Sequence, residues 1–148
     1  MTEIQGRIVQ AARGWIGTPY RHQASVKGVG ADCLGLLRGV WREVCGPEPE
    51  GTPAYTPDWA EPSGREALFD AACRWLVRKA AADVAAGDVV LFRMTDGGIA
   101  KHLGLVGDVG PQPTFIHAYS GHGVVENSLS APWARRIVAR FSFPLGEI

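Results

Sequence analysis

The sequence lacks an excess of charge of either sign, a cysteine framework and a long hydrophobic run. Its 15 basic and 15 acidic residues give a formal net charge of zero, which argues against a nucleic-acid partner or an anionic membrane surface. Three cysteines without a CxxC pair argue against a disulfide framework or a cysteine-rich zinc site. No apolar stretch is long enough to span a bilayer, so we expect no membrane insertion.

The first residues, MTEIQGRIVQ, also lack the basic region and apolar run of a signal peptide. We therefore expect a chain that is synthesised in the cytoplasm without a signal peptide. No cofactor is expected either, and no short metal-ligand pair such as HxxxH or CxxC stands out in the sequence.

The chain reads as one domain over residues 1–148, with helices first and strands afterwards. Apolar residues at spacings of three and four predict helices over residues 4–16, from Asp32 to about residue 45, and over about 63–80. Between the last two lies a proline-rich segment, residues 46–62, with five of the ten prolines, which we expect to cross the surface in an extended form.

Beyond residue 86 the pattern changes to short apolar runs bounded by turns. They predict about five strands, which we expect to form an antiparallel sheet. Their expected ranges are 89–94, 102–106, 114–119, 124–129 and 136–143. Helices followed by an antiparallel sheet define an α+β fold.

Cys33 is the candidate nucleophile because of its position at a predicted helix start. It follows a glycine-rich loop and Asp32, which is a good N-cap residue. A thiol in the first turn lies at the positive end of the helix dipole, which favours the thiolate. The carboxylate of Asp32 opposes this effect, so the net shift of the thiol pKa is not fixed by the sequence.

Two histidines can supply the base that such a thiol needs. His102 begins the run HLGLV and His117 lies in TFIHAY, and pairing about the turn between them places position 102 opposite roughly position 117. One imidazole can then orient the other beside the thiol, as in a triad of nucleophile, base and orienting group. In this hypothesis His102 takes the thiol proton and His117 fixes its tautomer.

Other interpretations of these residues stay open. Cys33, His102, His117 and His122 could instead hold zinc, although no HxxxH or CxxC pair anchors such a site. His22 and His122, taken alone, are expected to be structural. Tyr20 could direct its phenol toward the thiol and an oxyanion, or simply pack beneath its loop.

Five ordered motifs resemble those of the NlpC-type cell-wall cysteine peptidases, over almost the whole chain. They are WIGTPYRHQA (15–24), ADCLGL (31–36), AAGDVVLF (85–92), KHLGLVGD (101–108) and FIHA (115–118). The resemblance implies a papain-like fold and cleavage of peptidoglycan stem peptides, typically at the γ-D-glutamyl to diamino-acid bond. It implies Cys33 as nucleophile, His102 as base, His117 as the orienting residue and Tyr20 beside the oxyanion.

The same resemblance bears on substrate binding. It implies that Asp32 contacts or positions the substrate. Two positions depart from the usual pattern: Leu34 stands where a serine is common, and His22 begins HQA where Trp-Gly-Gly is common. Both fall where substrate is held, so Leu34 and His22 are the expected determinants of substrate preference.

The HQAS and DCLGL motifs, with a helix after a proline-rich segment, look most like the branch found in phage tails and gene-transfer agents. This implies a component of the virion or gene-transfer-agent tail, bound to tail hub or tail-tip proteins, acting in the periplasm of the target cell. Three alternatives remain: a structural tail protein without useful catalysis, a zinc-dependent hydrolase, and a thioester enzyme that transfers acyl groups to or from another amide.

Overall fold

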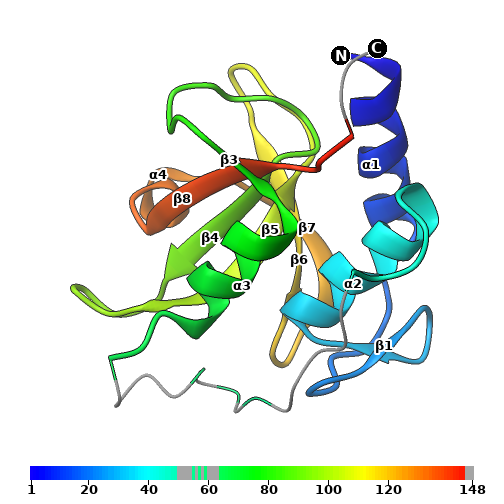
Figure 1. Ribbon diagram of the computed structural model, residues 1–148, viewed down its shortest axis with the longest axis horizontal. Coiled ribbons are helices and arrows are strands. Elements are labelled where there is room, and N and C mark those ends of the chain that lie inside the picture. Colours follow the sequence, from blue (N-terminus) through cyan, green and yellow to red (C-terminus); the bar gives the residue numbers. More distant parts are fainter. Residues whose placement is uncertain (50–54, 56, 58, 60–63, 146–148) are drawn as a thin grey trace.

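The structure is a computed structural model that describes residues 1–49, 55, 57, 59 and 64–145. Its helices and strands follow the order expected for an α+β fold (Figure 1). In chain order they are α1 (Glu3–Arg13), β1 (Ser25–Val26), β2 (Gly30–Ala31), α2 (Cys33–Val44), α3 (Ala67–Trp75), β3 (Val77–Lys79), β4 (Val89–Arg93), β5 (Ala100–Val106), β6 (Thr114–Tyr119), β7 (Gly123–Ser128), α4 (Ala131–Ala134) and β8 (Ile137–Ser142).

Six strands form one antiparallel sheet in the order β3-β8-β4-β5-β6-β7, and β1 and β2 form a separate small hairpin. The five predicted strands correspond to β4 to β8. The sixth, β3, was missed because a helix was expected to run to about residue 80. The helix ends at Trp75, and Val77–Lys79 pairs with β8 instead, since the open edge of β8 offers this segment the hydrogen bonds of a sheet.

The first and third predicted helices differ from the observed ones at their ends. Helix α1 starts with a capping box between Thr2 and Gln5 and ends at Arg13, three residues before the expected end at residue 16. Gly17 adopts a φ of 94°, and its N–H bonds to the carbonyl of Val124, so this glycine ties the chain after α1 to β7. Ser63, the expected start of the third helix, lies outside the described residues.

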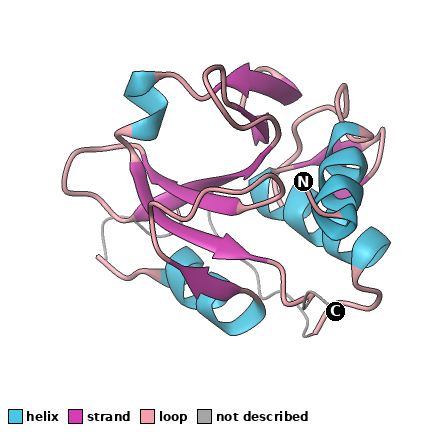
Figure 2. Cartoon of the chain, turned by 90° about the horizontal axis from the view of Figure 1, so that it is seen from above, coloured by secondary structure: helices cyan, strands magenta, loops and turns pink. Residues whose placement is uncertain are grey.

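Two apolar clusters lie on the two faces of the sheet. The larger one joins α1, α2 and α3 to β5 and β6 through residues such as Leu36, Leu103 and Ile116. The smaller one contains Phe92 and Phe115, and Trp133 on α4 packs against it. Figure 2 accordingly shows helices on both sides of the strands.

Two glycines allow α2 to pack closely on its neighbours. A methyl group at Gly35 would lie 1.8 Å from the carbonyl oxygen of Ala24, and one at Gly39 would lie 1.9 Å from the ring of Trp15. Glycine within a helix costs about 1 kcal/mol relative to alanine, and here the close packing offsets that cost. The first turn of α2 is thereby held against the loop that precedes it.

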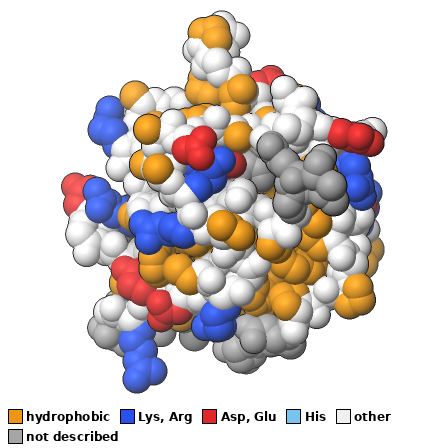
Figure 3. Space-filling view, turned by 45° about the horizontal axis from the view of Figure 1, so that its top comes forward, with side chains coloured by type: hydrophobic (Ala, Val, Ile, Leu, Met, Phe, Trp, Pro, Cys, Tyr) orange, Lys and Arg blue, Asp and Glu red, His pale blue; other side chains and the backbone are white. Residues whose placement is uncertain are grey.

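The surface agrees with the balanced charge of the sequence. Figure 3 shows Lys and Arg side chains interspersed with Asp and Glu over the face in view. Within the described parts of the chain, no helix combines the length and the apolar character that crossing a membrane requires.

Candidate active site

The nucleophile candidate stands where the sequence predicts it, in the first turn of α2. Asp32 is the N-cap: its Oδ1 accepts a hydrogen bond of 2.7 Å from the N–H of Gly35. Its Oδ2 accepts from the N–H of Gln23 at 2.7 Å and from the hydroxyl of Tyr55. Asp32 is only 2% exposed, so this carboxylate fixes the helix start and the two segments in front of it.

The thiol of Cys33 is buried, and its environment opposes ionisation. Burial, reinforced by the charge of Asp32, raises the pKa of Cys33 to about 12, although backbone N–H groups of Leu103 and Leu34 act in the opposite direction. The helix start alone was expected to favour the thiolate; the full environment reverses that local effect. The resting nucleophile is therefore a neutral thiol that needs a base.

The base candidate, His102, lies near this thiol. It directly precedes Leu103 on β5, whose backbone N–H acts on the thiol of Cys33, and both Cys33 and His102 line the same pocket. His102 Nε2 lies 2.7 Å from Nδ1 of His117 on β6. This bond engages Nε2 and leaves Nδ1 of His102 for the thiol proton. Burial lowers the pKa of His102 to about 3, with a contribution from His117, so the imidazole is neutral and able to accept a proton.

The strand register behind this pair differs from the prediction. Leu105 pairs with Ile116 and Val106 with Phe115; extended along both strands, this register sets position 102 opposite 119 and not 117. The two histidines are therefore diagonal neighbours, a separation that large rings still bridge. Position 104 lies opposite His117 in this register, and it is a glycine.

A third polar side chain extends the pair. His117 Nε2 lies 2.7 Å from Oδ1 of Asn127 on β7. Burial lowers the pKa of His117, and the bond to Asn127 partly counteracts this. The sequence prediction missed Asn127. One signal was available, because side chains alternate between the two faces of a strand and Asn127 therefore shares a face with Val125 in the run VVENS. Val125 is the cross-strand partner of His117.

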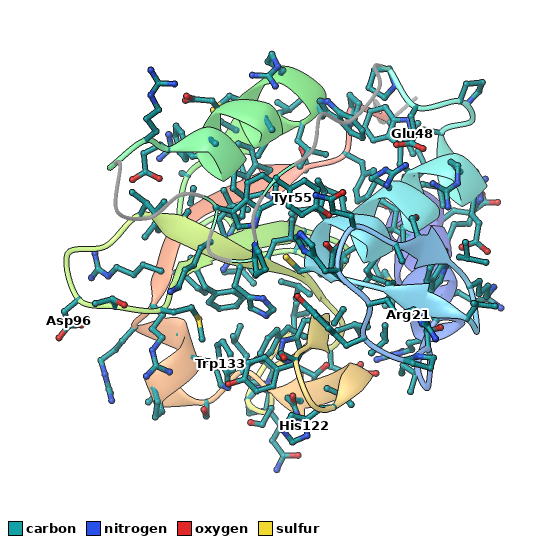
Figure 4. The ribbon with its side chains drawn as sticks, turned by 90° about the horizontal axis from the view of Figure 1, so that it is seen from below. Arg21, Glu48, Tyr55, Asp96, His122 and Trp133 are labelled. Atoms are coloured by element: carbon teal, nitrogen blue, oxygen red, sulfur yellow. The ribbon has the colours of Figure 1, made fainter. Side chains whose placement is uncertain are left out.

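Aromatic rings cover the two histidines. Trp133 on α4 lies 5.3 Å from the ring of His117 and 5.9 Å from that of His102, measured between ring centroids. Phe115 and Tyr119 flank His117 at 4.2 and 5.4 Å. In the view of Figure 4, Trp133 and His122 lie toward the bottom of the molecule and Tyr55 lies above them. The rings exclude water, which strengthens the hydrogen bonds between the imidazoles.

A pocket of about 190 Å³ opens at Cys33 and His102. Its described lining further includes Tyr20, His22, Asp32, Tyr55, Pro57, Trp59, Met94, Lys101, Ala118, Tyr119 and Ser120. Lys101 and His102 are adjacent on β5, yet both reach the pocket. Phe92 on β4 pairs with His102 and Arg93 pairs with Ala100, so Lys101 has no partner on β4 and forms a β-bulge. A bulge of this kind changes the direction of the side chains beside it.

The residues predicted to bind substrate occupy different environments. Tyr20 lines the pocket, and burial raises the pKa of its phenol, so it remains protonated as a hydrogen-bond donor. His22 also lines the pocket, and its Nε2 lies 2.8 Å from the carbonyl oxygen of Tyr55. Leu34 is buried in the larger cluster and is not among the lining residues. The roles of Asp32, Leu34 and His22 in substrate binding stay predictions.

The zinc alternative finds no geometric support in the part of the chain that the structure describes. Its residues include no group of three or more His, Cys, Asp or Glu side chains placed to hold a metal ion. What the structure brings together is a thiol and two imidazoles, the candidate nucleophile, base and orienting group, at one end of the sheet, where β5 begins and β6 ends.

Comparison with known proteins adds a family and a fold. The model of the NlpC/P60 family matches residues 17–141. A search of curated proteins found no match. Among solved structures, a protein from Staphylococcus aureus described as similar to lipoprotein, NLP/P60 family, superposes with a TM-score of 0.62 at 20% identity, over 97% of this chain and 42% of its own.

Two further structures are similar. An NlpC/P60 family protein from Bacillus cereus has a TM-score of 0.64 at 16% identity, over 94% of this chain and 40% of its own. The structure of Ly7917 with the hydrolyzing product of MDP has a TM-score of 0.63 at 14% identity, over 95% of this chain and 63% of its own. This chain thus spans about two fifths of the length of the first two proteins.

Proposed function

The chain belongs to the NlpC/P60 family, and from this membership we propose that it is a cysteine peptidase that hydrolyses peptidoglycan stem peptides at the γ-D-glutamyl to diamino-acid bond. The observation that carries the proposal is the 2.7 Å bond from His102 to His117 beside a buried thiol at a capped helix start. A nucleophile, a base and a group that orients the base are the minimum for thiol-based amide cleavage.

The chemistry follows from the protonation states at rest. Cys33 transfers its proton to Nδ1 of His102 as Sγ attacks the carbonyl carbon, and a C–S bond forms. The tetrahedral intermediate then breaks its C–N bond, and His102 returns the proton to the leaving amine, which leaves a thioester. Water attacks the thioester with His102 as the base, the C–S bond breaks, and the sulfur regains a proton as the carboxylic acid departs.

The developing oxyanion needs hydrogen-bond donors close to the sulfur. The backbone N–H of Cys33 lies at the start of α2, where the helix dipole also favours negative charge. The protonated phenol of Tyr20 is a second donor in the same pocket. These two groups are the oxyanion donors in this proposal.

The substrate class rests on family resemblance and on the structural relative Ly7917, which was determined with the hydrolyzing product of MDP. The pocket supports a polar ligand, because it presents His22, Lys101 and Ser120 as well as aromatic walls. Leu34 and His22 remain the positions at which we propose that substrate preference differs from that of relatives.

The test is cleavage of a defined muropeptide, with the products identified by mass spectrometry. Cys33→Ala should abolish cleavage without unfolding the chain, and Cys73→Ala, an exposed cysteine on α3, should retain it. Cleavage by Cys33→Ala at the wild-type rate would overturn the proposal. Loss of cleavage in the presence of a metal chelator would favour the zinc-dependent alternative.

We further propose that the protein acts as a component of a phage-like or gene-transfer-agent tail, bound to tail hub or tail-tip proteins, in the periplasm of the target cell. The support is the resemblance of the HQAS and DCLGL motifs and of the helix after the proline-rich segment. Immunogold labelling of purified particles should mark the tail tip, and unlabelled particles would refute this role. Particles carrying Cys33→Ala that still deliver DNA at the wild-type frequency would point to the structural alternative.

A further inference from the structure

Asn127 occupies an unusual position for a residue on the outer strand of a sheet. It lies on β7 opposite Phe115 and diagonal to His117, on the same face of the sheet. The residue is exposed, whereas His117 is fully buried. Its side-chain oxygen nevertheless lies 2.7 Å from Nε2 of His117, so an exposed amide reaches inward to the end of the histidine pair.

This contact determines where the protons of both imidazoles lie. A carbonyl oxygen only accepts hydrogen bonds, so Nε2 of His117 must carry the proton that it donates to Asn127. The neutral ring of His117 then has an unprotonated Nδ1, which can only accept. Nε2 of His102, 2.7 Å away, must therefore carry a proton, and the lone pair of His102 is left on Nδ1. That is the nitrogen that a base facing the thiol needs.

We propose that Asn127 is a positioning residue that selects the active tautomers of His117 and His102 through this chain of two hydrogen bonds. The inference rests on the proposed function, because it assigns the origin of the base used there. Asn127 itself is not among the described residues that line the pocket. Without the accepting oxygen, His117 can place its proton on Nδ1, which in turn drives the proton of His102 onto the nitrogen facing Cys33 and disables the base.

Water is a poor substitute for the amide at this position. The ring of His117 has no exposed surface, and Phe115, Tyr119 and Trp133 pack around it. The other titratable groups that face His117 are His102 on β5, Tyr119 on its own strand and His122 after it. Among the described residues, none of these groups forms a hydrogen bond with Nε2 of His117, and the oxygen of Asn127 is the acceptor for this nitrogen.

The kinetic test compares two substitutions of similar size. Asn127→Leu removes the acceptor and fills the space against water, and kcat/KM should fall roughly 10- to 100-fold, the range found for partners that orient metal-bound imidazoles. Asn127→Asp retains an acceptor, so it should keep activity within a few-fold of wild type. Its negative charge favours the imidazolium, which should move the acid limb of the kcat/KM profile to higher pH. Ser128→Ala, at an exposed neighbouring position, is the control for changes in β7.

A structural role would give a different pattern. Both variants would then lose activity together with thermal stability, and the pH profile would keep its position. Wild-type kcat/KM in Asn127→Leu, or an unshifted acid limb in an active Asn127→Asp, would each overturn the proposal.

A second measurement is independent of any substrate. Long-range ¹H–¹⁵N correlation spectra of the free protein report which ring nitrogen of each histidine is protonated. Both His102 and His117 should carry the proton on Nε2 in the wild type, and the His117 proton should move to Nδ1 in Asn127→Leu. An unchanged pattern would refute the role of Asn127 even if the enzyme is active. The expected change without any cleavage of muropeptides would leave the role intact and refute the proposed substrate.

Discussion

Replacement of Gly104 by alanine tests the link between the sheet and the site. The added methyl group would lie 2.8 Å from a ring carbon of Phe115, 3.2 Å from the carbonyl oxygen of Ile116 and 3.4 Å from Cβ of His117. Carbon atoms in contact are normally 3.5–4.0 Å apart, so the ring of Phe115 must retreat by roughly 0.7–1.2 Å. It cannot do so freely, because Phe92 and Trp133 lie 5.2 and 5.1 Å away, measured between ring centroids.

Two magnitudes follow from this crowding. Overpacking of a filled core costs about 1–3 kcal/mol, and at about 2–4 °C per kcal/mol for a chain of this length the Tm should fall by roughly 2–12 °C. Displacement of His117 should cost activity as well, because a shift of 1 Å in a catalytic group can cost about 100-fold in rate. We expect kcat/KM to fall roughly 10- to 100-fold at a temperature where the variant is still folded.

The assay combines calorimetry with muropeptide cleavage, and the chain offers a matched control. Gly6 lies in α1, and a methyl group there would contact only the sulfur of Met1, at 3.6 Å. Gly6→Ala should therefore raise stability by up to about 1 kcal/mol through helix propensity and leave kcat/KM unchanged. If Gly104→Ala has the Tm and the kcat/KM of the wild type, the packing described here around His117 is wrong.

Two further predictions concern stability. Asp88 is 2% exposed and forms ion pairs with Lys79, at 2.9 Å, and Arg140, at 2.8 Å. Asp88→Ala should lower the free energy of unfolding by about 3–5 kcal/mol, because it leaves buried charges unpaired. Asp108→Ala removes only an exposed partner of Arg13 and should lower it by at most about 1 kcal/mol. Equal losses in chemical denaturation would contradict this. The lowered pKa values of His102 and His117 mean that the unfolded chain binds more protons below pH 6.5, so the free energy of unfolding should fall as the pH drops from 6.5 toward 3. His102→Gln should weaken that dependence, and an identical slope in the two proteins would argue against a neutral, buried His102.

Local features of the chain could be predicted from the sequence because their causes are local. Asp32 caps the helix and Cys33 follows it in the first turn, since the preference of Asp for an N-cap and the apolar spacing after it act within a few residues. The strands β4 to β8 were predicted from alternation and turn residues for the same reason. The end of α3 was not, because Val77–Lys79 becomes a strand only through pairing with β8, more than sixty residues later.

The sequence by itself thus determined the α+β order of elements, the capped thiol of Cys33 and the pair of histidines that could serve it. Only the tertiary structure decided how these groups act on one another. The register of β5 on β6 made His102 and His117 diagonal neighbours, and the pairing of β7 brought Asn127 to the far nitrogen of His117. Burial reversed the effect of the helix start and raised the pKa of Cys33. The physical reason is that register and desolvation depend on contacts between distant segments, which no local pattern specifies.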